Sequence, residues 1–223
     1  YLDISEVELD DQVLPELFKE LKKLETLRMI ETKCKPTEDA FIYLKNLKEL
    51  KIEGIQIPKE CTNIFVPLKS LEKLEMGSRE IFNYDAFSKV KNLSYLSLSQ
   101  YSTIEIDKNF FVNHPNLRFL NLTRLNLHDY RGESKTNWID LKALTNLKSL
   151  EYLYLYDNNL KLDQDYEIFS LRNVTRLDLS QNYNKSFIKS ELILNEFTFK
   201  RMNSLKYLNL SGNRIKLEGN CFQ

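Results

Sequence analysis

The sequence predicts an α/β-type repeat solenoid, in which one short strand from each turn joins a curved parallel sheet on the concave side. Two observations predict it. The pattern L-x-x-L-x-L recurs from end to end of the 223 residues, and a large apolar residue, most often Phe, stands six positions before its first leucine. Alternating apolar residues are typical of a strand with one buried face, and repetition every 20 to 29 residues or so is typical of stacked turns.

The strands follow from the register of the repeat. The second leucine of the pattern falls at Leu2, Leu27, Leu50, Leu74, Leu96, Leu120, Leu153, Leu177 and Leu208. Strands are therefore expected near residues 2–4, 24–29, 47–52, 71–76, 93–98, 117–122, 150–155, 174–179 and 205–210. Six intervals between these leucines are 22 to 25 residues, whereas two are 33 and 31. The two long intervals predict polar surface insertions near residues 127–138 and 182–193.

The return path of each turn carries a second apolar column. Six positions before the first leucine stand Phe18, Phe41, Phe65, Phe87, Phe111, Leu144, Ile168 and Phe199. One turn cannot bury these side chains alone, so neighbouring turns must stack to form a continuous core. We therefore expect one domain over residues 1–223. Neither end shows a polar capping repeat, which predicts an interior part of a longer array.

These motifs resemble the "typical" class of leucine-rich repeats, as found in the ectodomains of Toll and Toll-like receptors. The resemblance covers essentially the whole chain. It implies a horseshoe whose return path is mostly loops and short helices. It also implies a ligand-recognition module of a cell-surface innate-immune or developmental receptor, extracellular or in the endosomal lumen. Such a module binds a protein or microbial ligand and mediates receptor homo- or hetero-dimerisation. The alternatives are an intracellular leucine-rich-repeat scaffold or adaptor and a secreted leucine-rich-repeat co-factor.

The asparagine that links neighbouring turns in this class is present in part of the chain. It occurs as Asn158, Asn182 and Asn213, whereas earlier turns place Thr32 or Ile55 there. An amide satisfies backbone groups of the neighbouring turn, and the other residues do so poorly or not at all. The first two-thirds of the solenoid are therefore expected to be less regular.

Aromatic residues gather at outward positions of the predicted sheet. The residues on either side of the second leucine point away from the core, and parallel strands align them in columns. The resulting cluster is Tyr95, Phe119, Tyr152, Tyr154 and Tyr156. Tyrosine suits protein interfaces, so the cluster is a candidate ligand-binding surface. Two other interpretations stay open: the rings cover one another as ordinary strand residues, or the insertion near residues 127–138 folds over them. Tyr130, Arg131 and Trp138 of that insertion are second candidates.

Composition and motifs favour a binding protein and not an enzyme. Lys+Arg and Asp+Glu are equal at 32 each, so the net charge gives no indication of a nucleic-acid partner. No apolar run reaches the length of a membrane span, about 20 residues. His114 and His128 lie in different repeats. His114 occupies a core position, which predicts a hydrogen-bonded structural histidine. No motif indicates a cofactor, a metal or a catalytic group.

Cysteines and glycosylation acceptor sequences bear on the compartment. Cys34 and Cys61 lie on the return paths of adjacent repeats, so a disulfide between them is sterically feasible, with two unpaired thiols as the alternative. The triplet N-x-S/T occurs at Asn92, Asn121, Asn173, Asn184 and Asn209. Asn121 and Asn209 fall where the repeat itself favours this triplet, whereas Asn173 and Asn184 are more informative. Together these features favour an extracellular protein.

Overall fold

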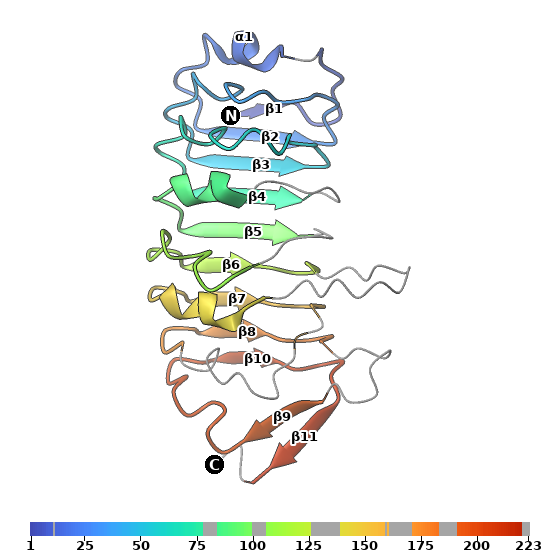
Figure 1. The fold of residues 1–223 in the computed structure, drawn as a ribbon, viewed down its shortest axis with the longest axis vertical. Helices are drawn as coiled ribbons and strands as arrows, with labels where there is room; N and C mark the ends of the chain where they lie inside the picture. Colours follow the sequence, from blue (N-terminus) through green and yellow to red (C-terminus); the bar gives the residue numbers. More distant parts are fainter. Residues whose placement is uncertain are drawn as a thin grey trace.

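The structure is a solenoid with a single long parallel sheet. The computed structural model describes residues 1–10, 12–77, 84–99, 106–125, 139–158, 160, 171–182 and 191–219. Within them the sheet has nine strands in the order β1-β2-β3-β4-β5-β6-β7-β8-β10 (Figure 1). The predicted repeat solenoid is confirmed.

The strands stack leucine on leucine. They are β1 (Leu2–Asp3), β2 (Thr26–Ile30), β3 (Glu49–Glu53), β4 (Lys73–Gly77), β5 (Tyr95–Ser99), β6 (Phe119–Asn121), β7 (Tyr152–Tyr154), β8 (Arg176–Asp178) and β10 (Tyr207–Asn209). From β2 onward they begin two residues later than the predicted ranges. The reason is that the first leucine of the pattern lies in a tight, hydrogen-bonded backbone turn just before the strand. The backbone N–H of Leu24, for example, donates to the carbonyl of Leu21 at 2.9 Å. Each second leucine pairs in register with the next, as Leu27 does with Leu50.

The return path is mostly irregular, with short helices α1 (Leu14–Phe18), η1 (Tyr84–Lys89) and η2 (Leu141–Asn146), of which α1 lies at the β1 end of the column (Figure 1). Its core is a ladder of buried phenylalanine rings. Neighbouring rings are stacked with centroids 6.0 to 6.2 Å apart in the run Phe18, Phe41, Phe65 and Phe87, and Phe111 is also fully buried. Together with the strand leucines they form one continuous hydrophobic core. Consecutive turns therefore hold one another, as the sequence predicts.

The asparagine ladder forms as expected. The amide of Asn182 donates to the carbonyls of Leu155 and Leu179, and its oxygen accepts the backbone N–H of Asn158 at 3.0 Å. Asn213 makes the equivalent bond to Leu179 at 2.8 Å. In the first repeats, the Thr32 hydroxyl donates to the carbonyl of Ile4 at 2.8 Å and supplies part of the same contact.

The prediction of a less regular first part is wrong for the sheet. Strands β2 to β5 have five residues each, whereas β6, β7, β8 and β10 have three. On β2 to β5 the strand pairing continues for two more residues and satisfies those backbone groups itself, as in the pairing of Glu53 with Gly77. The asparagine side chain and the longer strand are thus two ways to supply hydrogen bonds to the backbone groups of the neighbouring turn.

A left-handed residue ends the strand region of the turns. It stands four positions after the second leucine, and its φ is positive in Glu6, Glu31, Gly54, Arg124, Asp157, Gln181 and Gly212. This conformation costs about 1–2 kcal/mol for a residue with a side chain, and the neighbouring turns hold it in place. In these repeats the left-handed residue directs the chain from the concave sheet into the return path, always at the same position relative to the second leucine.

A second, two-stranded parallel sheet was not predicted. Strand β9 (Leu192–Asn195) pairs with β11 (Ile215–Glu218), and this pair is set apart from the main column (Figure 1). The insertion predicted near 182–193 therefore ends inside a strand, because Leu192 and Leu194 alternate and are buried. The insertion 127–138 lies wholly outside the described residues.

Candidate binding face

The concave sheet presents two columns of outward side chains. The first runs through the residues before the second leucine, where Tyr95, Phe119 and Tyr152 are direct partners on β5, β6 and β7. The second runs through the residues after it and contains Tyr154 on β7. The sequence register therefore brings the predicted aromatic residues together. We call Tyr95, Phe119, Tyr152, Tyr154 and Tyr156 the aromatic strip.

Tyr95 is enclosed on both faces of its ring. The Phe119 ring stacks on one side, with centroids 4.0 Å apart and planes 6° from parallel. Strand β4 lies on the other side, and the ammonium of Lys73 stands 4.9 Å from the centre of the Tyr95 ring. Burial raises the pKa of the Tyr95 hydroxyl to about 12, and the Glu75 carboxylate adds to the shift. Tyr95 is therefore a fixed part of the surface, since neither ring face is open to a ligand.

The strip becomes more exposed towards β7. Phe119 contacts the ring of Tyr152 at 6.1 Å and that of Tyr154 at 5.3 Å, both tilted. The side chain of Tyr152 is 39% exposed. At the far end of the strand, the guanidinium of Arg124 lies 5.3 Å from the ring centre of Tyr156. The arrangement has open apolar edges and hydroxyls of the kind found in protein interfaces.

The first four strands carry a different surface. Arg28 forms an ion pair with Asp3 at 3.5 Å. Lys51 pairs with Glu75 at 3.2 Å and Lys73 with the same carboxylate at 3.0 Å. These two ammonium groups lower the pKa of the Glu75 carboxyl against the raising effect of its burial, which is the largest single influence. The charges here neutralise one another across neighbouring strands, so this part offers little unpaired charge to a ligand.

Three residues of this face were missed as site candidates: Lys73, Arg176 and Tyr207. They continue the column of Tyr95, Phe119 and Tyr152, since Tyr152 pairs with Arg176 and Arg176 with Tyr207. The guanidinium of Arg176 lies 4.5 Å from the centre of the Tyr207 ring. The repeat register contained this signal, but the arginine interrupts the aromatic run, so the run of rings in the sequence pattern stops at Tyr152.

Two of the N-x-S/T glycosylation triplets, those at Asn121 and Asn209, are explained by the turn that ends each strand. The Asn121 oxygen accepts from the backbone N–H and the hydroxyl of Thr123, and its amide donates to Ser97 at 3.2 Å. Asn209 accepts in the same way from Ser211. In equivalent positions, the carboxylates of Asp3 and Asp178 accept the same two bonds from Ser5 and Ser180. Because aspartate cannot carry a glycan, the triplet at this place has a structural reason.

The triplets at Asn92 and Asn173 lie in the turns that precede β5 and β8. Both side chains are exposed, and their amides donate to the carbonyls of Lys69 at 2.8 Å and Lys148 at 2.7 Å. Asn46 makes the same bond without a glycosylation triplet. Asn184, together with Tyr130, Arg131 and Trp138, lies outside the described residues. Asn92 and Asn173 thus remain the acceptors whose exposure fits glycosylation.

The thiol of Cys61 is buried and free. Its sulfur lies 3.7 Å from the carbonyl oxygen of Pro36, and burial raises the pKa of the thiol. The structure therefore does not contain the bridge that the sequence allows between Cys34 and Cys61.

The predicted structural role of His114 is confirmed. The imidazole is fully buried, with Nε2 3.2 Å from the carbonyl oxygen of Phe87. Burial lowers the pKa of His114, and Nδ1 has no hydrogen-bond partner among the described residues. The described part of the chain holds no group of three or more His, Cys, Asp or Glu able to bind a metal ion. In that same part, no helix is long and apolar enough to cross a membrane.

Comparison with known proteins supports the repeat. No protein-family model matches the chain. It is 36% identical to Toll-like receptor 5 of Homo sapiens over 168 residues, which are 70% of this chain and 17% of that receptor. It is 27% identical to human Toll-like receptor 8 over 194 residues, 81% of this chain and 18% of that receptor. The chain is a leucine-rich-repeat protein. It resembles a fragment of a Toll-like receptor ectodomain and spans less than a fifth of the length of these two receptors.

The same fold occurs in a solved receptor complex. The crystal structure of the TLR13–ssRNA13 complex superposes with a TM-score of 0.69 and covers 97% of this leucine-rich-repeat chain and 33% of that one, at 21% identity. This likeness shows the fold. The receptor relatives are not enzymes, and the chain is a module of a class built for protein interaction.

Proposed function

We propose that this chain is part of the ligand-recognition module of a cell-surface innate-immune or developmental receptor. In this proposal the aromatic strip binds a protein or microbial ligand, and the bound ligand brings two receptor chains together. The module works by recognition and not by catalysis. The similarity to Toll-like receptors supports the receptor class, and the repeat fold supports a binding role.

The observation that carries the proposal is the contrast across the concave sheet. On strands β1 to β4 the basic side chains of the two outward columns pair with neighbouring carboxylates. On strands β5 to β7 the rings pack against one another, and Tyr152 remains 39% exposed. Rigid, partly exposed aromatic residues give large contact area at a small entropic cost, which is why they dominate protein-interface energetics.

The test removes the two rings of strand β7. The chain and its Tyr152→Ala/Tyr154→Ala variant are screened against one panel of purified secreted proteins and microbial surface components. A matched control, Thr26→Ala/Arg28→Ala, changes the same two columns on β2. We expect a ligand of the wild-type chain to bind the tyrosine variant about a hundredfold more weakly, and the control nearly unchanged. Both variants should melt within a few degrees of the wild type.

Equal binding of a ligand to the wild type and the tyrosine variant would show that the aromatic strip is not the recognition surface. Dimerisation is tested on the same samples by sedimentation velocity with and without ligand. A complex that contains a single copy of the chain at saturating ligand would contradict the dimerisation part of the proposal.

The extracellular or endosomal location is part of the proposal and is supported by the exposure of Asn92 and Asn173. The free thiol of Cys61 favours the second candidate, an intracellular leucine-rich-repeat scaffold or adaptor, because buried thiols persist in reducing compartments. Expression through a eukaryotic secretory pathway separates the two. A secreted, glycosylated chain supports the receptor, whereas an unglycosylated chain that is not secreted supports the scaffold.

A further inference from the structure

Arg176 stands between two exposed tyrosines on the concave face. Strand β8 lies between β7 and β10, and the register makes Tyr152 and Tyr207 the direct neighbours of Arg176. Tyr152 is 39% and Tyr207 43% exposed, and Arg176 is exposed too. These three side chains therefore form the most accessible part of the column that begins with the enclosed ring of Tyr95.

The positive charge of Arg176 has no ion-pair partner among the described residues. The other basic residues in the two outward columns are Arg28, Lys51 and Lys73, and each forms an ion pair with a neighbouring carboxylate. Within the described residues, Arg176 forms none.

The nearest carboxylate in the columns is already engaged. Asp178 lies on the same strand, but one of its oxygens accepts from the hydroxyl and backbone N–H of Ser180 and the other accepts from the Asn209 amide at 3.1 Å. The unmatched charge of Arg176 therefore faces solvent.

The guanidinium of Arg176 contacts an aromatic ring. Its central carbon lies over the Tyr207 ring, 4.5 Å from the ring centre, which is a cation–π contact. Its N–H groups lie in the guanidinium plane, and within the described residues none of them forms an ion pair. A planar fork of this kind matches a carboxylate through two parallel hydrogen bonds, and the flanking tyrosines partly desolvate the pair.

We infer that Arg176 binds a carboxylate of the ligand, while Tyr152 and Tyr207 contact apolar side chains on either side of it. The occupant is thus an acidic segment of a protein, with Asp or Glu next to an apolar residue. This inference rests on the proposed function and names the chemistry of its partner.

A nucleic acid fits the same surface poorly. A polyanion needs several unpaired cations, and within the described columns Arg176 is the one that has no ion pair. Base stacking needs open ring faces, whereas Lys73 and Phe119 cover those of Tyr95. Charge and ring geometry together favour the acidic protein segment.

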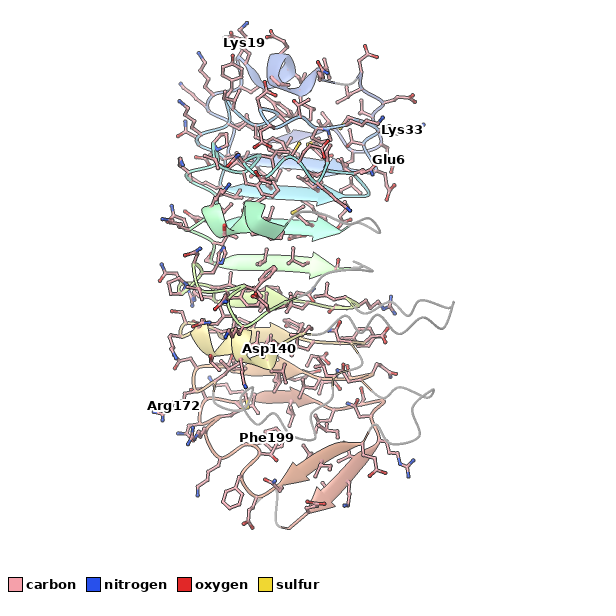
Figure 2. All side chains as sticks on the ribbon, in the orientation of Figure 1. Glu6, Lys19, Lys33, Asp140, Arg172 and Phe199 are labelled. Carbon is pink, nitrogen blue, oxygen red and sulfur yellow. The ribbon has the colours of Figure 1, made fainter. Side chains whose placement is uncertain are left out.

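The test selects peptide ligands directly, so the natural ligand need not be identified first. A library of displayed random 12-residue peptides is selected on the wild-type chain, on Arg176→Gln, on Tyr152→Ala and on a control, Arg172→Gln. Arg172 belongs to the same repeat but lies at the edge where the strands begin (Figure 2). We expect Asp or Glu beside an apolar residue to be enriched with the wild type and with the control, and not with Arg176→Gln.

Affinities of one selected peptide and its Glu→Gln or Asp→Asn form then complete a double-mutant cycle. The acid should improve binding to the wild type about tenfold and have little effect on Arg176→Gln. The variant Arg176→Lys keeps the charge but loses the planar fork, and should recover part of the effect. Melting temperatures check that each variant is folded.

Three outcomes overturn the inference. Peptides that depend on Tyr152 but show no acid preference refute the role of Arg176 and leave the aromatic strip intact. Acid enrichment that survives Arg176→Gln assigns the charge contact elsewhere. Peptides that are indifferent to both Arg176→Gln and Tyr152→Ala, or the absence of any specific peptide, contradict the proposed binding face as well.

Discussion

The rings of Tyr95 and Phe119 lie face to face on adjacent strands, with their centres 4.0 Å apart and their planes 6° from parallel. The contact buries one face of each ring. It also fixes both side chains before any ligand arrives. A surface already ordered in this way loses less conformational entropy on binding, which favours affinity.

The enclosure of Tyr95 predicts a late phenolate titration. Its pKa is raised from the ordinary value of 10.0 to about 12, because burial disfavours the charged form. The stabilisation linked to this hydroxyl is therefore complete below pH 10 and is lost as the pH rises from 10 to 12. Ultraviolet titration of the folded chain should show a step near pH 12 that is missing from Tyr95→Phe. A step that remains in this variant would belong to another tyrosine.

The burial of His114 predicts a loss of stability in acid. Its pKa is lowered by burial, so the folded chain favours the neutral imidazole and the unfolded chain binds the proton more readily. This contribution to stability is present above about pH 6.5 and is lost as the pH falls below that value. His114→Leu should remove it and change the free energy of unfolding at pH 7.5 by less than about 1.5 kcal/mol, because other repeats hold Leu or Val there.

Denaturant unfolding at pH 7.5 and pH 5 measures the effect as a difference between the two chains. Protonation of carboxylates acts on both and cancels. If the wild type and His114→Leu lose the same free energy between the two pH values, the buried imidazole is not the source.

The asparagine ladder predicts unequal costs for two similar substitutions. Asn182→Ala leaves the backbone N–H of Asn158 and the carbonyl of Leu155 without this partner inside the solenoid. We expect it to lower the free energy of unfolding by about 2–4 kcal/mol, since a buried unsatisfied polar group costs about 1–3 kcal/mol. Asn46→Ala loses one exposed bond to Lys22 and should cost at most about 1 kcal/mol. Equal costs in urea titrations would contradict a structural role for the ladder.

The exposure of the glycosylation acceptors predicts which asparagines carry glycans. After secretion and enzymatic deglycosylation, peptide mass mapping should find Asn92 and Asn173 converted to aspartate, because both are exposed in turns at the strand starts. Asn121 and Asn209 should be unmodified, because both are only partly exposed and a glycan there would cover the concave face. Thr175→Ala should remove one glycan while Asn173 stays in place. A glycan on Asn121 would argue against a broad interface at the aromatic strip.

Much of the binding face could be predicted from the repeat register. Every second leucine pairs with the next, so an outward residue at one position must neighbour its equivalent one turn later. That rule placed Tyr95, Phe119 and Tyr152 in one column. It did not show that Lys73 and Phe119 cover both faces of Tyr95, because rotamers and cross-strand stacking are not periodic in the sequence.

The small sheet of β9 and β11 was missed for a different reason. Leu192 and Leu194 alternate like a strand, but they lie outside the L-x-x-L-x-L register and follow a polar stretch. Their partner β11 lies 23 residues further along, counted from Leu192 to Ile215, where the repeat predicts the start of a return path. A periodic pattern identifies pairs that repeat and gives no information about a pair that occurs once.

The sequence by itself determined the solenoid, the stacking of its leucines and phenylalanines, and the columns of the concave face. These depend on a short pattern repeated many times, and each turn can bury its apolar side in just one way against the next. The tertiary structure decided which rings stay open, which charges are paired, and that Arg176 faces solvent between Tyr152 and Tyr207. Those properties depend on side-chain geometry across strands, where residues 20 to 30 or so positions apart compete for the same partner.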